Sequence, residues 1–140
     1  MNDEALWERF HARTLAESDW THQAHLRVAW MFLERHAIDE AHVLMRVGII
    51  RLNLAHGLIE TAQRGYHETL TRVWLAIVAD ERTRAQVATS QAFVTEAASS
   101  LTRESPLRFY SKARLLSLEA RAMFVPPDLS PLPNPQLNLK

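Results

Sequence analysis

The chain has 140 residues, of which 47% are apolar and 23% charged, a composition typical of one globular domain with a sizeable core. Sixteen acidic residues balance sixteen basic ones, and this neutrality argues against a nucleic-acid-binding surface. Cysteine is absent, which excludes disulfides and thiolate metal sites, so a metal ion would need imidazole or oxygen ligands.

The first residues, Met-Asn-Asp-Glu, are acidic and are not followed by an apolar run, so we expect no signal peptide. No stretch approaches eighteen consecutive apolar residues, and we therefore expect no membrane partner. Together these features predict a cytoplasmic protein.

Helix breakers are rare before residue 126: there are three glycines in all, and five of the six prolines lie between Pro126 and Pro135. Apolar residues recur at spacings of three and four, and the alternation typical of strands is not sustained. The sequence predicts an all-α fold, a single-domain bundle of five to six helices in residues 1–125. An extended, proline-rich tail is expected in residues 126–140.

The predicted helices cover residues 3–16, 20–35, 39–55, a range that begins between 61 and 66 and ends at 79, then 83–101 and 106–124. Ser18 or Asp19 is expected to cap the second helix and Asp39 the third, because their side-chain oxygens can accept hydrogen bonds from free amides at a helix start. Pro106 suits the first turn of the last helix.

Histidines form the most informative pattern of the chain. His22 and His25 lie three residues apart and share one face of the second predicted helix. His67 faces the same side as the apolar stripe of the fourth helix. Imidazoles from separate helices can hold one divalent ion and leave open positions for a reaction. We therefore predict a metal site of His22, His25 and His67, with ordinary core or surface histidines as the alternative.

The ligand set leaves the metal open: three histidines suit zinc or copper, and two histidines with a carboxylate suit iron(II). Aromatic residues near the histidines favour oxidative chemistry with iron or copper over hydrolysis with zinc. Glu68 is predicted to act as a base or to orient a histidine, with direct ligation as the alternative. Tyr110 is the second predicted catalytic residue, as a proton donor or as a group that binds the ion.

Four further residues are predicted to bind substrate. Trp20 would form a wall beside the histidine pair, and Asn53 lies inside a predicted helix, where asparagine is unfavourable. Lys112 and Arg114 would hold an anionic group. The alternative for this basic segment is a helix start capped by Ser111 with solvated basic side chains.

The remaining histidines are expected to serve no site. His11, His36 and His42 are expected to face solvent. His56 would stand at a helix C-terminus, where the helix dipole favours it, and it would replace His22 if that residue were not a ligand.

The segments Trp20–Leu26 (W-T-H-Q-A-H-L), Gly65–Thr69 (G-Y-H-E-T) and Tyr110–Leu115 (Y-S-K-A-R-L) resemble those of an uncharacterised family of small helical bacterial proteins. This resemblance implies the helical fold and carries no activity. A looser similarity links the chain to helical metalloproteins of the DinB-like group, although their later histidine-rich motif is absent here. Only the architecture is comparable, and fold does not imply function.

The functional prediction is a small metal-dependent enzyme with one divalent ion, acting on a small, anionic molecule. A non-enzymatic helical module that binds a metabolite or a metal is the alternative. A homodimer formed through a helix face, or a purely structural partner protein with an exposed apolar stripe, is also consistent with the pattern.

Overall fold

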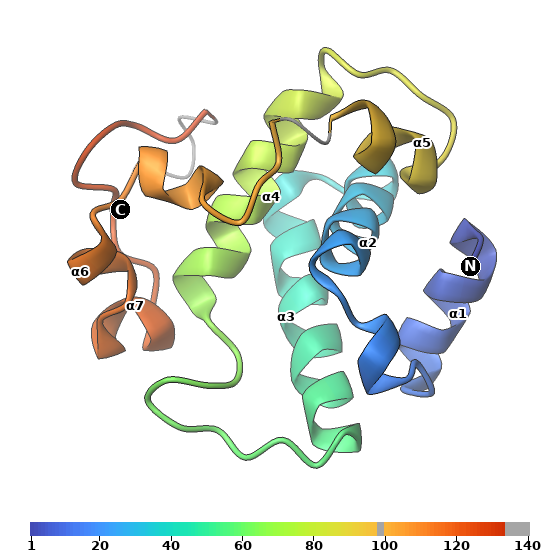
Figure 1. Ribbon diagram of the computed structural model, residues 1–140, viewed down its shortest axis with the longest axis horizontal. Helices are drawn as coiled ribbons and strands as arrows, with labels where there is room; N and C mark the ends of the chain where they lie inside the picture. The colour runs from blue at the N-terminus through green and yellow to red at the C-terminus, as the bar shows by residue number, and fades with distance from the viewer. Residues whose placement is uncertain (98–99, 134–140) are drawn as a thin grey trace.

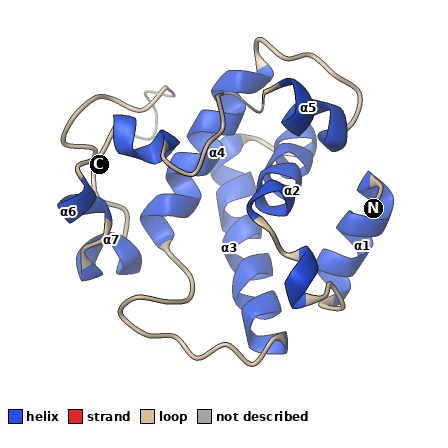
Figure 2. Cartoon of the chain, in the orientation of Figure 1, coloured by secondary structure: helices blue, strands red, loops and turns tan. Residues whose placement is uncertain are grey.

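The computed structural model describes residues 1–97 and 100–133. The described residues form seven α-helices, two short 3-10 helices and no strand, which confirms the all-α prediction (Figures 1 and 2). None of these helices combines the length and the apolar character that crossing a bilayer requires. The α-helices are α1 (Asp3–Ala12), α2 (His22–Arg35), α3 (Ile38–Ala55), α4 (Glu68–Arg82), α5 (Ser90–Glu96), α6 (Lys112–Leu115) and α7 (Leu118–Ala122).

Helices α2, α3 and α4 form the centre of the fold, with α1 and α5 against α2 and with α7 against α4 (Figure 1). Every residue from Leu26 to Leu33 in α2 is buried. A helix that is buried around its whole circumference must be surrounded by others. The position of α2 between α1, α3, α4 and α5 satisfies this requirement.

Two predicted helix caps are wrong. Thr21 caps α2 by accepting a hydrogen bond from the Ala24 amide, whereas Ser18 and Asp19 belong to a 3-10 turn over Glu17–Asp19. Helix α3 begins after Ala37 without a side-chain cap, so Asp39 lies inside the first turn. There its carboxylate still complements the positive end of the helix dipole.

The last two predicted helices are shorter than expected. Thr89 starts α5 by accepting a hydrogen bond from the Ala92 amide, so the expected helix over 83–101 shrinks to Ser90–Glu96. Residues 98–99 of that range lie outside the described part of the chain. The expected helix over 106–124 is divided because Ser111 and Ser117 each cap a new helix. A serine that caps offers the backbone an alternative to helix continuation.

The described part of the tail forms no helix or strand, and it bends at residues 128–130. Val125 and Leu132 are buried, and the amide of Leu129 donates to the carbonyl of Phe109 at 3.0 Å. The hydroxyl of Tyr110 donates to the carbonyl of Val125 at 2.5 Å. These contacts hold the start of the tail against the fold, and residues 134–140 of the predicted tail lie outside the described residues.

Candidate functional site

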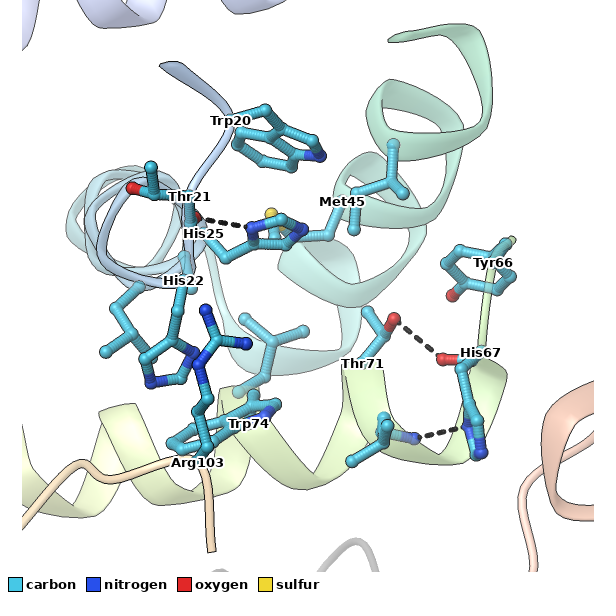
Figure 3. Close-up of a pocket in the computed structure, with 15 residues that line it drawn as sticks. Trp20, Thr21, His22, His25, Met45, Tyr66, His67, Thr71, Trp74 and Arg103 are labelled. Atoms are coloured by element: carbon cyan, nitrogen blue, oxygen red, sulfur yellow. Dashed lines mark hydrogen bonds between the residues drawn. The ribbon is translucent and has the colours of Figure 1, made fainter. Parts of the chain in front are cut away.

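A cavity of about 310 Å³ lies between α2, α3 and α4 (Figure 3). This size is within the range of small-molecule sites, which are mostly apolar with a few well-placed polar groups. Its apolar and aromatic walls include Trp20, Leu26, Ile49, Tyr66, Leu70 and Trp74, and its polar lining includes His22, His25, His67, Thr71 and Arg103. The fold therefore brings all three predicted histidine ligands and Trp20 to one cavity.

His25 presents a free ring nitrogen to this cavity. Its Nδ1 lies 2.8 Å from the carbonyl oxygen of Thr21, one turn earlier in the chain. Because a carbonyl only accepts, Nδ1 carries the proton and Nε2 keeps a bare lone pair. In Figure 3 the ring extends from α2 toward Met45 on α3, inside the cavity.

The surroundings of His25 keep the imidazole neutral. The indole of Trp20 stacks on it, with ring centroids 3.7 Å apart. Burial lowers the pKa of His25 to about 4, and the hydrogen bond to Thr21 opposes this shift only in part. At neutral pH the side chain is therefore an uncharged acceptor or a ligand, and not an imidazolium.

His22 lies beside Arg103 and Trp74 at another part of the same cavity (Figure 3). Its Nε2 donates to the carbonyl oxygen of Leu101 at 3.3 Å, which leaves Nδ1 without a proton. Burial lowers the pKa of His22, and the hydrogen bond to Leu101 partly compensates. The ring is thus neutral but is held by a backbone group from a distant part of the chain.

Arg103 supplies the positive charge of the cavity. The residue is exposed, and within the described part of the chain its guanidinium forms no hydrogen bond or ion pair with the protein. In Figure 3 the guanidinium extends alongside His22 into the pocket. An arginine that is not neutralised by the protein can bind a carboxylate or phosphate in a bidentate manner.

His67 has a structural role in this arrangement. Its Nδ1 accepts a hydrogen bond from the Leu70 amide at 3.0 Å and so caps α4. Its Nε2 donates to the carbonyl oxygen of Leu115, at the end of α6, at 2.9 Å. Both nitrogens are engaged, so His67 has no lone pair to offer an ion here.

The predicted three-histidine metal centre is therefore not assembled in this arrangement. Among the residues that the structure describes, no three histidine, aspartate or glutamate side chains are placed to share one ion. The His22 and His67 rings lie on opposite sides of the cavity in Figure 3. Metal binding stays a prediction, and of the three predicted ligands His22 and His25 each keep one ring nitrogen that no described residue engages.

Glu68 lies outside the cavity, in a buried polar cluster between α3 and α4. Arg46 donates to both carboxylate oxygens, at 2.7 and 3.1 Å, and the Tyr66 hydroxyl donates to Oε1 at 2.8 Å. His42 Nε2 is 2.9 Å from Oε2, away from the direction of an aligned hydrogen bond. Burial alone would raise the pKa of Glu68, but the hydrogen bonds from Arg46 and Tyr66 lower it overall. Glu68 is therefore an ionised partner of Arg46.

The other predicted site residues are not brought to the cavity. Tyr110 is completely buried, and burial raises the pKa of its hydroxyl to about 12. Arg114 donates to the carbonyl of Pro126 at 2.6 Å, and Lys112 is exposed at the start of α6. Asn53 lies on α3, one turn after Ile49, and is not one of the residues that line the cavity. In this structure Tyr110 and Arg114 hold the tail.

Sequence reasoning missed Arg103 and the buried His42. His42 was expected to face solvent, but only 7% of it is exposed. Its spacing of three and seven residues from Met45 and Ile49, which are both buried, is a signal of inward orientation. No comparable signal marks Arg103, because it lies in a loop without periodicity.

Comparisons of this chain with protein-family models, with curated proteins and with solved structures give no match. The resemblance to the helical bacterial family stays a prediction.

Proposed function

We propose that this protein binds a small, flat, largely apolar molecule with an acidic group in the cavity beside His25. The proposal rests on the combination, in one aromatic-walled cavity, of a bare, neutral Nε2 on His25 with Arg103, whose guanidinium pairs with none of the residues that the structure describes. The cavity volume of about 310 Å³ suits a metabolite-sized ligand.

The aromatic walls favour a flat ligand. Trp20 and Trp74 line the cavity with Tyr66, and offset or edge contacts of a planar ligand with such rings stabilise binding beyond burial alone. An apolar body replaces water in the cavity without requiring hydrogen bonds. The acidic group of the ligand would pair with Arg103, where the guanidinium is accessible.

The state of His25 favours binding over proton abstraction. A general base is most effective when its pKa is near the working pH. The pKa of His25 is about 4, so the ring is a weak base at neutral pH but remains a good hydrogen-bond acceptor. A hydroxyl or N–H group of the ligand would donate to Nε2.

The test uses 1-naphthoate and its neutral amide, 1-naphthamide, as probes followed by NMR of the tryptophan side chains. Trp20 and Trp74 line the cavity, whereas Trp7 and Trp30 do not and serve as internal references. Naphthoate should shift the indole N–H signals of Trp20 and Trp74 only. It should bind at least fivefold more tightly than the amide.

Variants separate the two contacts. Arg103→Gln should remove the preference for naphthoate over naphthamide, and His25→Ala should weaken the binding of both. Arg108→Gln is the matched control, because its guanidinium stacks on Phe109 outside the cavity. If the signals of Trp7 and Trp30 shift as much as those of Trp20 and Trp74, or if the acid and the amide bind equally, the proposal is wrong.

A metal-dependent enzyme is the second candidate, and the bare Nε2 of His25 is the observation that favours it. An iron, copper or zinc ion would take His25 as one ligand and His22 Nδ1 as another. To become the third ligand, His67 would first have to lose its hydrogen bonds to Leu70 and Leu115. The ion would supply a Lewis acid or a redox centre for a small-molecule reaction in the cytoplasm.

Titration of untagged protein with Zn²⁺ tests this candidate. The expected result is one ion per chain, with shifts at the His25 ring and loss of binding in His25→Ala. His36→Ala is the matched control, since this ring pairs with Glu40 outside the cavity. Binding that survives in His25→Ala would exclude the site.

A further inference from the structure

Thr71 lines the cavity from α4, at the end where Tyr66 also lies (Figure 3). Its hydroxyl donates to the carbonyl oxygen of His67, four residues earlier in the chain, at 2.9 Å. A hydroxyl group has one proton and two lone pairs, so the Thr71 oxygen can still accept hydrogen bonds but cannot donate another. The backbone at the start of α4 therefore makes Thr71 an acceptor for a molecule at this end of the cavity.

The Tyr66 hydroxyl is a second acceptor beside Thr71. It donates to Oε1 of Glu68, which lies outside the cavity, at 2.8 Å. Burial raises the pKa of Tyr66 and the Thr71 hydroxyl opposes this shift, so the two hydroxyl groups are neighbours. Each has its proton engaged elsewhere, and neither can donate to the other. Such a pair of oxygens is satisfied by an added N–H or O–H donor, and it repels an acceptor or an anion.

The positive charge of the cavity lies at a different place. The Arg103 guanidinium extends beside His22 in Figure 3, away from Thr71 and Tyr66. This guanidinium attracts a carboxylate, whereas the two hydroxyl oxygens attract the proton of a donor. The indoles of Trp20 and Trp74 belong to the walls of the same cavity. The cavity therefore offers a cation at one end and lone pairs at another.

We infer that the ligand of this cavity is an aromatic acid with an amino or hydroxyl substituent at the end remote from the acid, and that Thr71 selects this substituent. The inference rests on the proposed function and adds the substrate class to it. The acid pairs with Arg103, and the substituent donates to the oxygen of Thr71. An ether, ketone or fluoro substituent would instead place a lone pair against this oxygen. The oxygen would then lose its contact with water without a replacement, which weakens binding.

Binding of substituted naphthoates, followed by the indole signals of Trp20 and Trp74, tests the substrate class. The set contains 5-, 6- and 7-hydroxy-1-naphthoate and the fluoro compound for each position, since fluorine is close to hydroxyl in size but donates no hydrogen bond. One hydroxy compound should bind about fivefold more tightly than its fluoro counterpart, which is the typical contribution of one hydrogen bond. Binding of 1-naphthoate without this preference at any position would overturn the inference and leave the proposed function standing. If no naphthoate binds, both are wrong.

Variants of Thr71 test which residue selects the substituent. Thr71→Val replaces the hydroxyl by a methyl group and should reduce the preference for the hydroxy compound to less than about twofold, while 1-naphthoate still binds. Thr71→Ser keeps the hydroxyl and should keep the preference. Thr95→Val is the matched control, because the Thr95 hydroxyl also donates to a carbonyl four residues earlier at 2.9 Å but lies on α5, outside the cavity. A preference that survives in Thr71→Val, or that Thr95→Val removes equally, would overturn the assignment to Thr71.

Discussion

The indole of Trp20 lies nearly flat on the imidazole of His25, with centroids 3.7 Å apart and planes inclined by 27°. The Thr21 carbonyl holds the same imidazole through Nδ1. The ring is therefore fixed by two neighbours from the start of α2, and its Nε2 points into the cavity. This pair of contacts makes His25 a neutral, oriented group at the candidate site.

The lowered pKa of His25 predicts that the free energy of unfolding decreases between pH 6.5 and pH 4. The pKa of His25 falls from its ordinary value of 6.5 to about 4 on folding, so the unfolded chain takes up a proton first. The contribution of neutral His25 to the free energy of unfolding is complete above pH 6.5 and is lost as the pH falls toward 4. About 2 kcal/mol is lost between pH 7 and pH 5. Urea unfolding at the two pH values measures this loss.

The same measurement on His25→Gln should show a smaller dependence on pH. His22, His42 and His67 shift in the same direction as His25, so part of the dependence remains. Trp20→Leu should raise the pKa of His25 in an NMR titration, because water then reaches the ring. Identical pH dependence in wild type and His25→Gln would contradict the explanation.

His67→Ala should lower the free energy of unfolding by about 2 kcal/mol. Loss of a helix cap costs about 1 kcal/mol, and loss of the hydrogen bond to Leu115 costs about as much. His67→Asn is the informative comparison, because asparagine can cap α4 but is too short to reach Leu115. It should recover about 1 kcal/mol in urea unfolding. Equal stability of the two variants would show that capping is not the contribution of His67.

Glu68→Gln should destabilise the fold by about 2 kcal/mol and leave naphthoate binding within twofold of wild type. The substitution removes the negative partner of Arg46 and His42, and an unpaired buried charge is costly. Part of the Arg46 side chain is exposed, which limits the loss. Thermal unfolding measures the loss of stability in Glu68→Gln. Glu119→Gln, at an exposed position on α7, is the matched control. Loss of naphthoate binding with normal stability would instead place Glu68 in the site.

Gly48→Ala should destabilise the protein although alanine is the better helix former. A Cβ at this position in α3 would lie 2.4 Å from two ring carbons of Phe10, which is almost completely buried. The cost of displacing the ring, about 1–3 kcal/mol, exceeds the gain in helix propensity of about 1 kcal/mol. The double variant with Phe10→Leu should recover part of the loss in urea unfolding. Increased stability of Gly48→Ala would show that the ring moves freely.

Much of the fold was predictable because its signals are local. The spacing of apolar residues located α2, α3 and most of α4 within a few residues. The predicted helix bounds were wrong where a side chain caps a new helix, as Thr89 and Ser117 do. At such a residue the local sequence is compatible both with a continuous helix and with a cap. Four of the predicted site residues, Trp20, His22, His25 and His67, line one cavity, and their roles stay predictions.

The sequence by itself determined that the chain is helical and that His25 and His67 face inward, because helical periodicity depends only on neighbours along the chain. For His67 and His22, only the tertiary structure decided which ring nitrogens are free. The carbonyl groups that engage His67 and His22 come from Leu115 and Leu101, which are 48 and 79 residues away in the sequence. Hydrogen bonds between such distant groups depend on the packing of the whole chain and have no local signature.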